Sequence, residues 1–403
     1  MTFTKEHPVK NLMHDHGPAG RWSGPSLVAL VLAVSIALTA TACGKEKSHP
    51  VSAKLSGQLQ HILDTGVASS ETEFPGTAFS VSQPGLGTWA GAAGEAETAT
   101  HTPMKAGDTF RAGSIMKPFV AVVVLQLVEE GKLGLDDRLT AVLPERVVDR
   151  VANGPRITVR MLLNHTSGIA NYADESFDRS VLADPHRRWT VGDFLDLAAA
   201  KQPTSAPGAK FSYANTNYNL LGLVIEQATG EPWRQAVRDR VIDQLGLEHT
   251  SLPEPGGAAS GGVSAHGYNV VDGKLRDVTE IDTSMADAAG GDALVTTTAD
   301  LSRFLTALLA GDLFKERKTL REMKTWVKAS DGAGLTGYGL GLERYEFPGG
   351  VELIGHVGST AGYFAVMFRL PAQRVDLSMV MTSQVYSPAV LMPALKLLVA
   401  EAS

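Results

Sequence analysis

The chain has 403 residues, of which 44% are hydrophobic and 20% charged, so it can build a large core and is not a disordered protein. Its 43 acidic residues outnumber its 36 basic ones, and the formal net charge of -7 argues against a nucleic-acid partner. The single cysteine excludes a disulfide framework, cysteine-rich zinc sites and C-x-x-C redox chemistry.

The chain begins with the pattern of an export signal. A basic start is followed by an apolar run over residues 27–42, interrupted only by Ser and Thr, and small residues lead to Cys43. We therefore expect residues 1–42 to be a signal peptide, with an uncleaved membrane anchor as the alternative. Beyond residue 43, no apolar run reaches the roughly 20 residues that span a bilayer.

Cys43 stands at the expected cleavage point. The segment is similar to a bacterial lipoprotein signal, whose new N-terminal cysteine is acylated, although the usual Leu three residues earlier is Ala40 here. We expect Cys43 to be lipidated, and the alternative is an ordinary signal in which this cysteine is incidental. Residues 43–54 are polar and predict a tether. The protein would then be exported, either as a lipoprotein on the outer face of the cell membrane or as a secreted protein.

The body of the chain shows helical and strand patterns in a definite order. A helix is expected over residues 54–68, followed by a hairpin with strands at 75–83 and 88–93. Residues 115–130 are apolar almost all round, which predicts a buried helix ended by Gly131. Further helices are expected at 159–165, 189–200, 217–229, 232–245 and 299–309, with Thr158, Thr190 and Thr298 as N-caps. Strands are expected at 338–342, 351–357, 363–370 and 377–382, and a last helix at 389–402.

Strands at both ends of a helical middle predict an α+β fold. We expect an antiparallel sheet built from both termini and flanked by helices, with an inserted, mostly helical subdomain. One domain would span residues 55–403. Its α/β part would comprise about 55–135 and 290–403, and its helical part about 136–289.

The first chemical motif is Ser114 with Lys117, at the start of the buried helix. Residues three apart share one helix face, and a serine at a helix start has an exposed hydroxyl and a free backbone N–H. A buried lysine loses proton affinity and can act as a base toward that hydroxyl. Taken alone, a capping serine followed by a lysine that reaches the surface is the more frequent arrangement.

Two further motifs follow in the chain. Tyr213 and Asn215 precede a helix in an extended stretch, so both would point the same way, a phenol to relay protons and a carboxamide to hold an amide. His356, Val357, Gly358 and Ser359 end a strand, where the glycine would admit a ligand backbone and the Ser359 N–H could face an oxyanion. Alone, each motif is more often structural, as a helix entry with a core tyrosine or as a structural histidine.

In this order the three motifs resemble the S-x-x-K, Y-x-N and H-x-G motifs of the serine D-alanyl-D-alanine carboxypeptidase and class C β-lactamase family, the active-site serine penicillin-recognising enzymes. The stretches FRAGSIMKPF, ITVRMLLNHTSGI, PGAKFSYANTNYNLLGLVIE and AGGDALVTTTADLSRF are also similar to that family. The resemblance covers nearly all of residues 55–400.

The resemblance implies that Ser114 is the acylated nucleophile, Lys117 its basic partner, and Tyr213 the group that assists proton transfer to the leaving group. His356 would orient Tyr213. The backbone N–H groups of Ser114 and Ser359 would form the oxyanion hole. The substrate-binding residues that it implies are Asn215, Gly358, Ser359 and Thr360. No cofactor and no metal are implied.

Val357 departs from the family pattern, which usually has Thr between the His or Lys and the Gly. That threonine hydroxyl helps to bind a substrate carboxylate, and valine has none. Ser359 or Thr360 could substitute for it. We therefore expect neutral substrates to be used at least as well as acid-terminated ones, and Val357→Thr to improve acylation by penicillins.

The first functional expectation is an exported serine hydrolase, D-alanyl-D-alanine carboxypeptidase-like, acting through an acyl-Ser114 intermediate on cell-wall peptides. The alternatives are a β-lactamase-fold esterase or D-aminopeptidase, a β-lactamase, and a non-catalytic lipoprotein that binds wall peptides or penicillin. The expected partner is a small-molecule or peptide substrate: a peptidoglycan stem peptide, a β-lactam or an ester. The membrane would be contacted only through a lipid anchor, and the protein would be a monomer.

Overall fold

The computed structural model describes residues 50–69, 74–84, 87–254, 262–271, 273–281, 289 and 294–401. The expected signal peptide, Cys43 and most of the expected tether therefore lie outside the described residues. The last residues of that tether already belong to the folded body, because Val51 is buried and helix α1 (Ala53–Ser69) starts within it. Pro50 is bridged to Thr88 of the first hairpin.

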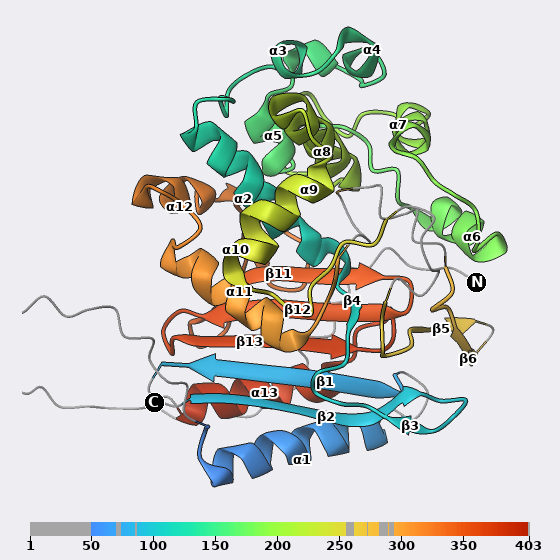
Figure 1. Ribbon diagram of the computed structural model, residues 1–403, viewed down its shortest axis with the longest axis vertical. Helices are drawn as coiled ribbons and strands as arrows, with labels where there is room; N and C mark the ends of the chain where they lie inside the picture. Colours follow the sequence, from blue (N-terminus) through green and yellow to red (C-terminus); the bar gives the residue numbers. More distant parts are fainter. Residues whose placement is uncertain are drawn as a thin grey trace, which may run out of the picture.

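A nine-stranded antiparallel sheet, in the order β3-β2-β1-β13-β12-β11-β10-β9-β8, unites the two ends of the chain (Figure 1). The amino-terminal hairpin joins the carboxy-terminal strands where β1 pairs with β13, with Thr77 opposite Met381. The strands are β1 (Gly76–Gln83), β2 (Gly87–Glu97), β3 (Thr102–Pro103), β8 (Val327–Lys328), β9 (Leu335–Tyr338), β10 (Glu343–Phe347), β11 (Val351–Thr360), β12 (Tyr363–Leu370) and β13 (Val375–Met381). The predicted α+β class, with one sheet from both termini, is confirmed.

Two layers of helices enclose this sheet. Helices α1 and α13 (Pro388–Glu401) cover one face, and α11 (Thr298–Ala310) with the inserted helices covers the other (Figure 1). Strand β1 shows how alternation serves both layers. Phe79 packs into the core on the α1 and α13 side, whereas the Ser80 hydroxyl donates to the Thr298 carbonyl of α11.

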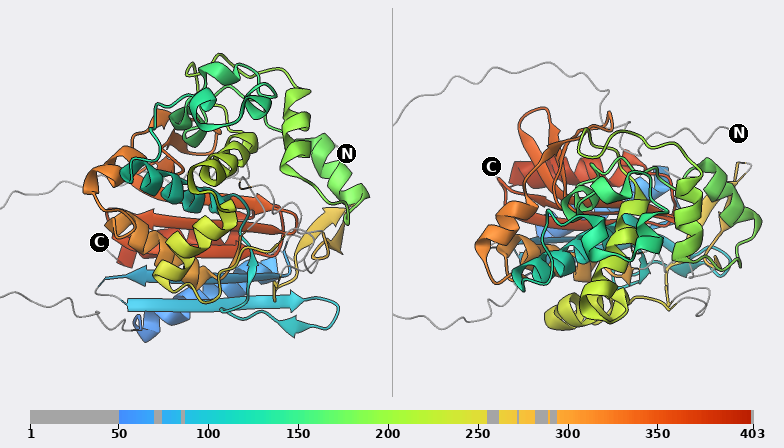
Figure 2. Two further views of the ribbon diagram at one scale, coloured as in Figure 1. Left: turned by 45° about the horizontal axis from the view of Figure 1, so that its top comes forward. Right: turned by 90° about the horizontal axis from the view of Figure 1, so that it is seen from above.

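The inserted part is mainly helical and gathers over one face of the sheet (Figure 2). It holds α3 (Leu139–Val142), α4 (Glu145–Val148), α5 (Val159–Leu163), α6 (Glu175–Ala183), α7 (Val191–Ala199), α8 (Asn215–Thr229), α9 (Trp233–Val237), the π-helical turn Arg238–Ile242 and α10 (Asp243–Leu245). The predicted caps Thr158 and Thr190 both accept a backbone N–H of the first turn. For α11 the cap is Thr297, one residue earlier than expected.

Short elements complete the fold. They are α12 (Arg317–Met323) and the strand pairs β4 (Phe110–Arg111) with β7 (Val295–Thr296) and β5 (Tyr268–Val271) with β6 (Lys274–Asp277). Within the described residues, no helix is long and apolar enough to cross a membrane.

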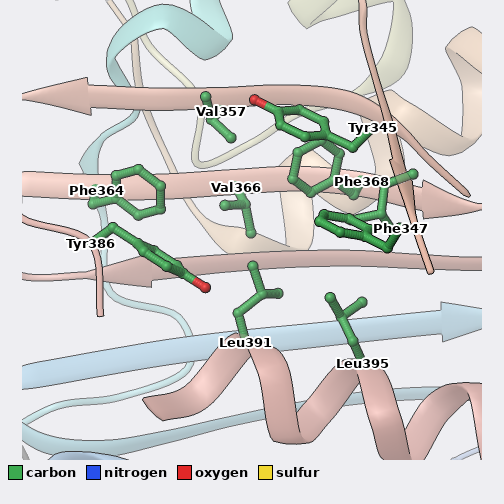
Figure 3. A pocket seen from close by; sticks show the side chains of 10 residues that line it. Tyr345, Phe347, Val357, Phe364, Val366, Phe368, Tyr386, Leu391 and Leu395 are labelled. Atoms are coloured by element: carbon green, nitrogen blue, oxygen red, sulfur yellow. The ribbon is translucent and has the colours of Figure 1, made fainter. Parts of the chain in front are cut away.

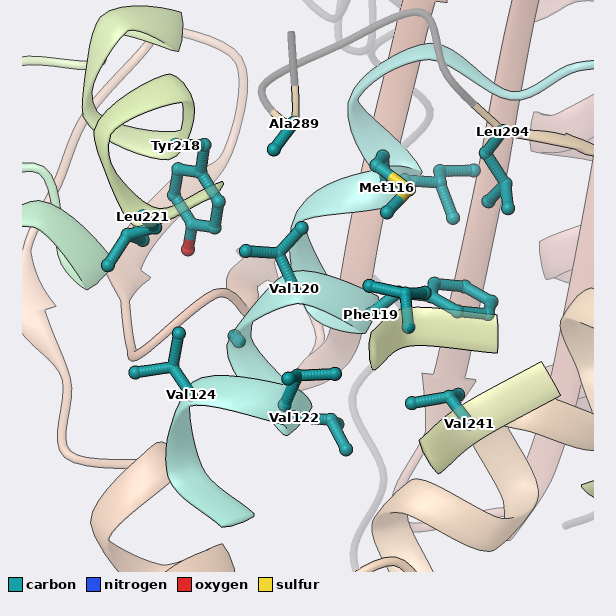
Figure 4. Packing of buried hydrophobic residues seen from close by; sticks show 14 of the residues in the cluster. Met116, Phe119, Val120, Val122, Val124, Tyr218, Leu221, Val241, Ala289 and Leu294 are labelled. Atoms are coloured by element: carbon teal, nitrogen blue, oxygen red, sulfur yellow. The ribbon is translucent and has the colours of Figure 1, made fainter. Parts of the chain in front are cut away.

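Helix α2 (Met116–Glu129) is the predicted buried helix, and apolar side chains surround it on every side (Figure 4). The ring of Phe119 stacks on Phe304 of α11 with centroids 3.7 Å apart. Tyr218 and Leu221 of α8 lie against the helix near Val120. Gly131, with a φ of 71°, follows its last turn as expected. Because α2 cannot shift in such a core, the residues at its start are held rigidly.

Candidate active site

Ser114 lies in the 3₁₀ turn Gly113–Ile115 that leads directly into α2. The Lys117 Nζ donates to the Ser114 Oγ at 2.9 Å, as the spacing predicted. It also donates to the Oδ1 of Asn215 at 2.7 Å. Lys117 is completely buried, so its side-chain nitrogen is out of bulk water and is held by these side chains. A lysine in such a position is suited to exchange a proton with the hydroxyl.

Tyr213 joins this pair from the other side. Its hydroxyl is hydrogen-bonded to Ser114, and its ring lies 4.8 Å from the Lys117 Nζ. Burial, and secondarily the charge of Glu343, raise the pKa of Tyr213 well above its usual value, against the effect of the bond to Ser114. Tyr213 is therefore a neutral phenol at ordinary pH, able to accept one proton while donating another.

Asn215 also contacts Lys117, but its backbone conformation differs from the expectation. It is the first residue of α8, preceded by the extended Ala214, and not part of one extended stretch with Tyr213. Its backbone N–H donates to the Oδ1 of Asn171 at 3.0 Å. The Asn215 side chain still meets Lys117, so the first two motifs converge.

His356 does not reach the cleft. It is fully buried on β11, where its Nε2 lies 3.0 Å from the Tyr338 hydroxyl and its Nδ1 lies 2.6 Å from the Val357 carbonyl oxygen. A carbonyl only accepts, so Nδ1 carries the proton and Nε2 accepts from Tyr338. The Tyr338 ring is 6.2 Å from the ring of Tyr213. The predicted orienting role of His356 therefore stays a prediction, and substrate contact is not open to this residue.

Strand β11 packs directly on the nucleophile turn, and glycines make this approach possible. A Cβ on Gly358 would lie 1.9 Å from the Ala112 carbonyl oxygen, and one on Gly113 would lie 3.0 Å from the Ser359 nitrogen. Gly358 thus makes room for the turn that carries Ser114, and the expectation that it also admits a ligand backbone stays a prediction. The contact places the Ser359 backbone beside that of Gly113, which is the arrangement a two-donor oxyanion hole needs.

A cleft of about 90 Å³ opens at Ser114. One wall is mainly apolar and comes from α6 and the segment before it; the other is mainly polar and comes from β5, the end of β11 and the residues after β13. The lining residues are Ser114, Tyr172, Ala173, Phe177, Asp178, Val181, Leu182, Asn215, Asn269, Ser359, Thr360, Ala361 and Gln384. Asn215, Ser359 and Thr360 line the same cleft as Ser114, and their role in substrate binding stays a prediction. Asp178 is the only charged residue of this lining.

The side chain of Val357 points away from the cleft. It is 7% exposed and packs in the apolar layer between the sheet and α13, beside Phe364, Val366 and Leu391 (Figure 3). Its neighbour Gly358 faces the nucleophile turn, and alternation along a strand turns Val357 to the opposite face. The premise that a hydroxyl at position 357 would serve the cleft is therefore wrong for this chain.

Two buried groups behind the site were missed by the sequence reasoning. Glu343 accepts the Val357 N–H at 2.9 Å, and burial raises the pKa of its carboxyl to about 8. His165, in the left-handed conformation with a φ of 58°, accepts the Ala214 N–H on Nδ1. Its ring lies 4.3 Å from that of Tyr213, and burial holds its pKa well below the usual value. His165 therefore supports the Tyr213 loop as a neutral imidazole.

Among the described residues, no group of three or more His, Cys, Asp or Glu side chains could hold a metal ion. A site composed of Ser114, Lys117 and Tyr213, with the Ser359 backbone beside the nucleophile turn, is suited to acyl transfer.

Known proteins resemble this chain over most of its length. The family model described as Beta-lactamase matches residues 59–402. Penicillin-binding protein 4 of Amycolatopsis lactamdurans is 29% identical over 294 residues, which are 70% of this chain and 74% of that protein. A D-stereospecific amidohydrolase from Streptomyces sp. superposes with a TM-score of 0.73 and 32% identity, over 83% of this chain and 97% of that one. The D-amino acid amidase of Ochrobactrum anthropi SV3, complexed with L-phenylalanine amide, superposes with a TM-score of 0.74 and 27% identity. The superposition covers 87% of this chain and 100% of the amidase chain.

Proposed function

The chain belongs to the β-lactamase family of serine hydrolases, and we propose that it cleaves amide or ester bonds of small amine-bearing substrates through an acyl-Ser114 intermediate. The Ser114 Oγ attacks the carbonyl carbon while its proton passes to Lys117, which returns a proton to Tyr213 as Tyr213 gives its own to the leaving group. The N–H groups of Ser114 and Ser359 stabilise the oxyanion. Tyr213 protonates the leaving amine or alcohol, and water then releases the acid and restores Ser114.

The charged groups that line the cleft are the observation on which this choice of substrate rests. No Lys or Arg lines the cleft as described, and the segments left undescribed within residues 50–401 contain neither residue type. Lys117 is not among the lining residues, and its Nζ is already hydrogen-bonded to the Ser114 Oγ. A substrate carboxylate would therefore meet neutral donors and the negative charge of Asp178. An ammonium group near Asp178 would be attracted instead.

The apolar wall supports the same choice. Tyr172, Phe177 and Val181 present a surface that suits an apolar side chain on the acyl group. An ammonium group, an apolar side chain and a scissile amide together describe an amino-acid amide, the class of compound bound in the D-amino acid amidase of Ochrobactrum anthropi SV3 complexed with L-phenylalanine amide. This favours the amidase or esterase alternative over a D-alanyl-D-alanine carboxypeptidase, whose peptide ends in a carboxylate.

The test compares four substrates on the purified mature domain: D-phenylalanine amide, its N-acetyl derivative, a p-nitrophenyl ester and an N-acylated peptide ending in D-Ala–D-Ala. Intact mass reports the acyl-enzyme, and kcat/KM reports turnover. We expect the free amine to be preferred over the N-acetyl amide. Faster turnover of the D-Ala–D-Ala peptide than of the amide and the ester would instead establish the carboxypeptidase.

Asp178→Asn isolates the charge. Asp178 is exposed, so its attraction for an ammonium group is screened to about 1 kcal/mol, or roughly fivefold in kcat/KM. The loss should be confined to the free amine and absent for the N-acetyl amide. Asp184→Asn is the matched control, since this exposed aspartate lies at the end of the same helix and outside the cleft. Equal losses on both substrates would contradict recognition of the amine.

We further propose that the enzyme is an exported monomer and that its only membrane contact is through acyl chains on Cys43. The apolar segment before Cys43 and the small residues at the junction support this. The mass of the mature N-terminus in wild type and Cys43→Ser would test it. An unmodified mature chain, or one that still carries residues 1–42, would contradict lipidation.

A further inference from the structure

The ladder between β10 and β11 ends beside the active site. It runs from Phe347 opposite Val351 to Glu343 opposite Gly355. Strand β11 continues for five more residues, to Thr360, paired on its other side with β12. Beyond Gly355, the edge of β11 that faced β10 has therefore lost its partner strand.

At Val357, just beyond the end of the ladder, the side chain of Glu343 takes the place of the missing strand as hydrogen-bond acceptor. The Oε2 of Glu343 accepts the Val357 N–H at 2.9 Å, and the Tyr345 hydroxyl donates to the same oxygen at 3.4 Å. The Glu343 side chain is 2% exposed. Burying a carboxyl group costs free energy unless its oxygens are hydrogen-bonded, so buried carboxyl groups are rare and usually have hydrogen-bond partners.

The next step along the same edge is the oxyanion hole. Backbone N–H groups two residues apart in a strand point in the same direction, so the N–H groups of Val357 and Ser359 both leave this edge of β11. Glu343 occupies the first, and the second lies beside the nucleophile turn at Gly113. The Glu343 carboxyl thus holds β11 at Val357, two residues before the Ser359 N–H to which a substrate carbonyl would bind.

We propose that Glu343 is the positioning residue of the oxyanion hole: its buried carboxyl ends the β10 ladder, fixes the edge of β11 through Val357, and so aims the Ser359 N–H at the carbonyl oxygen of the acyl group bound to Ser114. The proposal rests on the acyl-enzyme function proposed above. It assigns Glu343 no contact with substrate.

The same carboxyl also acts on Lys117 through its charge. The titratable groups around it are Lys117, Asp331, His356, Tyr213, Tyr218, Tyr338 and Tyr345. Burial raises its pKa to about 8, with a smaller raising effect from Asp331 and against the lowering effects of the Val357 N–H and Lys117. A neutral carboxyl still accepts the Val357 N–H through its carbonyl oxygen. An ionised one stabilises protonated Lys117, which cannot take the Ser114 proton.

The experiment compares Glu343→Ala and Glu343→Gln in the mature domain with Glu346→Ala and Glu346→Gln. Glu346 lies on the same strand and its side chain is half exposed, which makes it the matched control. The readouts are kcat and KM for a p-nitrophenyl ester, the pH profile of acylation, and the affinity of phenylboronic acid, whose tetrahedral adduct on Ser114 uses the oxyanion hole without turnover.

Glu343→Ala should lower kcat about 10- to 100-fold, somewhat less than removal of an oxyanion donor, with KM changed less than about threefold, because the donor acts in the transition state. Boronate affinity should fall with kcat. Glu343→Gln keeps the acceptor, so its activity at pH 7 should stay within about threefold of wild type. The pH at which acylation rises, as Lys117 loses its proton, should fall by about one unit, because removing a negative neighbour lowers the pKa of Lys117. Both Glu346 variants should match wild type.

A folded Glu343→Ala with wild-type kcat and boronate affinity would overturn the proposal. If that variant does not fold, Glu343→Gln decides, and a loss of kcat and boronate affinity well beyond threefold, despite the retained acceptor for the Val357 N–H, overturns the proposal. Failure of the parent function looks different: wild type itself would then turn over no ester or amide. Boronate binding would still report whether Glu343 shapes the hole.

Discussion

Replacing Val357 with Thr tests how the strand beside the nucleophile is turned. By family analogy the new hydroxyl would help to bind a substrate carboxylate and speed acylation by penicillins. In the structure the side chain is 7% exposed and faces the layer beneath α13. The new hydroxyl would therefore enter an apolar environment on the far face of the sheet, and we expect a loss of stability with no change in substrate preference.

The size of that loss follows from the surroundings. Thr and Val are nearly isosteric, so packing changes little, but burying a hydroxyl without a partner costs about 1–3 kcal/mol in proteins. The adjoining cavity of about 10 Å³ is at the lower limit for one water molecule and is lined mainly by apolar side chains. The lower end of the range applies if the hydroxyl bonds to that of Tyr386, which is buried without a partner among the described residues.

Denaturant unfolding measures this free energy, and second-order acylation rates with benzylpenicillin and a neutral ester measure selectivity. Val366→Thr is the matched control, because Val366 pairs with Val357 across the sheet, is 1% exposed and lines the same layer. Both variants should lose stability and keep the wild-type ratio of rates within about twofold. A tenfold gain for penicillin in Val357→Thr alone, with unchanged stability, would refute the placement of this side chain.

Ser114→Ala should abolish acyl labelling in intact mass spectra and change unfolding by no more than about 1–2 kcal/mol, since Ser114 makes no capping bond; labelling elsewhere would contradict the mechanism. Lys117→Ala and Tyr213→Phe should each slow acylation about 100-fold or more, and the double variant should be little worse, because the two act as one unit. Glu343 keeps a proton up to about pH 8 in the fold but loses it above its ordinary 4.5 when unfolded. Wild-type stability should therefore fall as pH rises between these values, and denaturant unfolding of Glu343→Gln should show a flatter dependence.

The parts of the fold that follow from composition and periodicity could be predicted. An apolar run with no polar face becomes the buried helix α2, and the cap at Thr158 lies where a hydroxyl precedes a short apolar repeat. The hairpin at the start and the strands β11, β12 and β13 also lie within a few residues of their expected bounds. In each case the local pattern and the burial agree, so nothing from the rest of the chain is needed to decide.

Strand β10 was missed because its pattern contradicts its burial. Glu343 and Arg344 begin it, and a run that opens with two charged residues is not the pattern of a central strand. The expected strand was therefore placed at residues 338–342, whereas β9 ends at Tyr338 and the chain then turns through Gly341, with a φ of 87°. Only tertiary contacts show that a carboxyl group is needed at this position, to accept the N–H of Val357.

The motif from His356 to Ser359 shows how far motif reasoning can go where a central strand extends beyond its neighbour. Side chains on such a strand point to two faces, and the backbone of its open edge offers a third direction. In this chain His356 and Gly358 face the helical side, Val357 faces α13, and the Ser359 backbone lies beside the nucleophile turn. A motif names the residue types but not these directions, because the directions depend on where the neighbouring ladder ends. The end of β10 at Glu343 therefore decides which atoms of the motif can meet substrate, and that position is the one to mutate first.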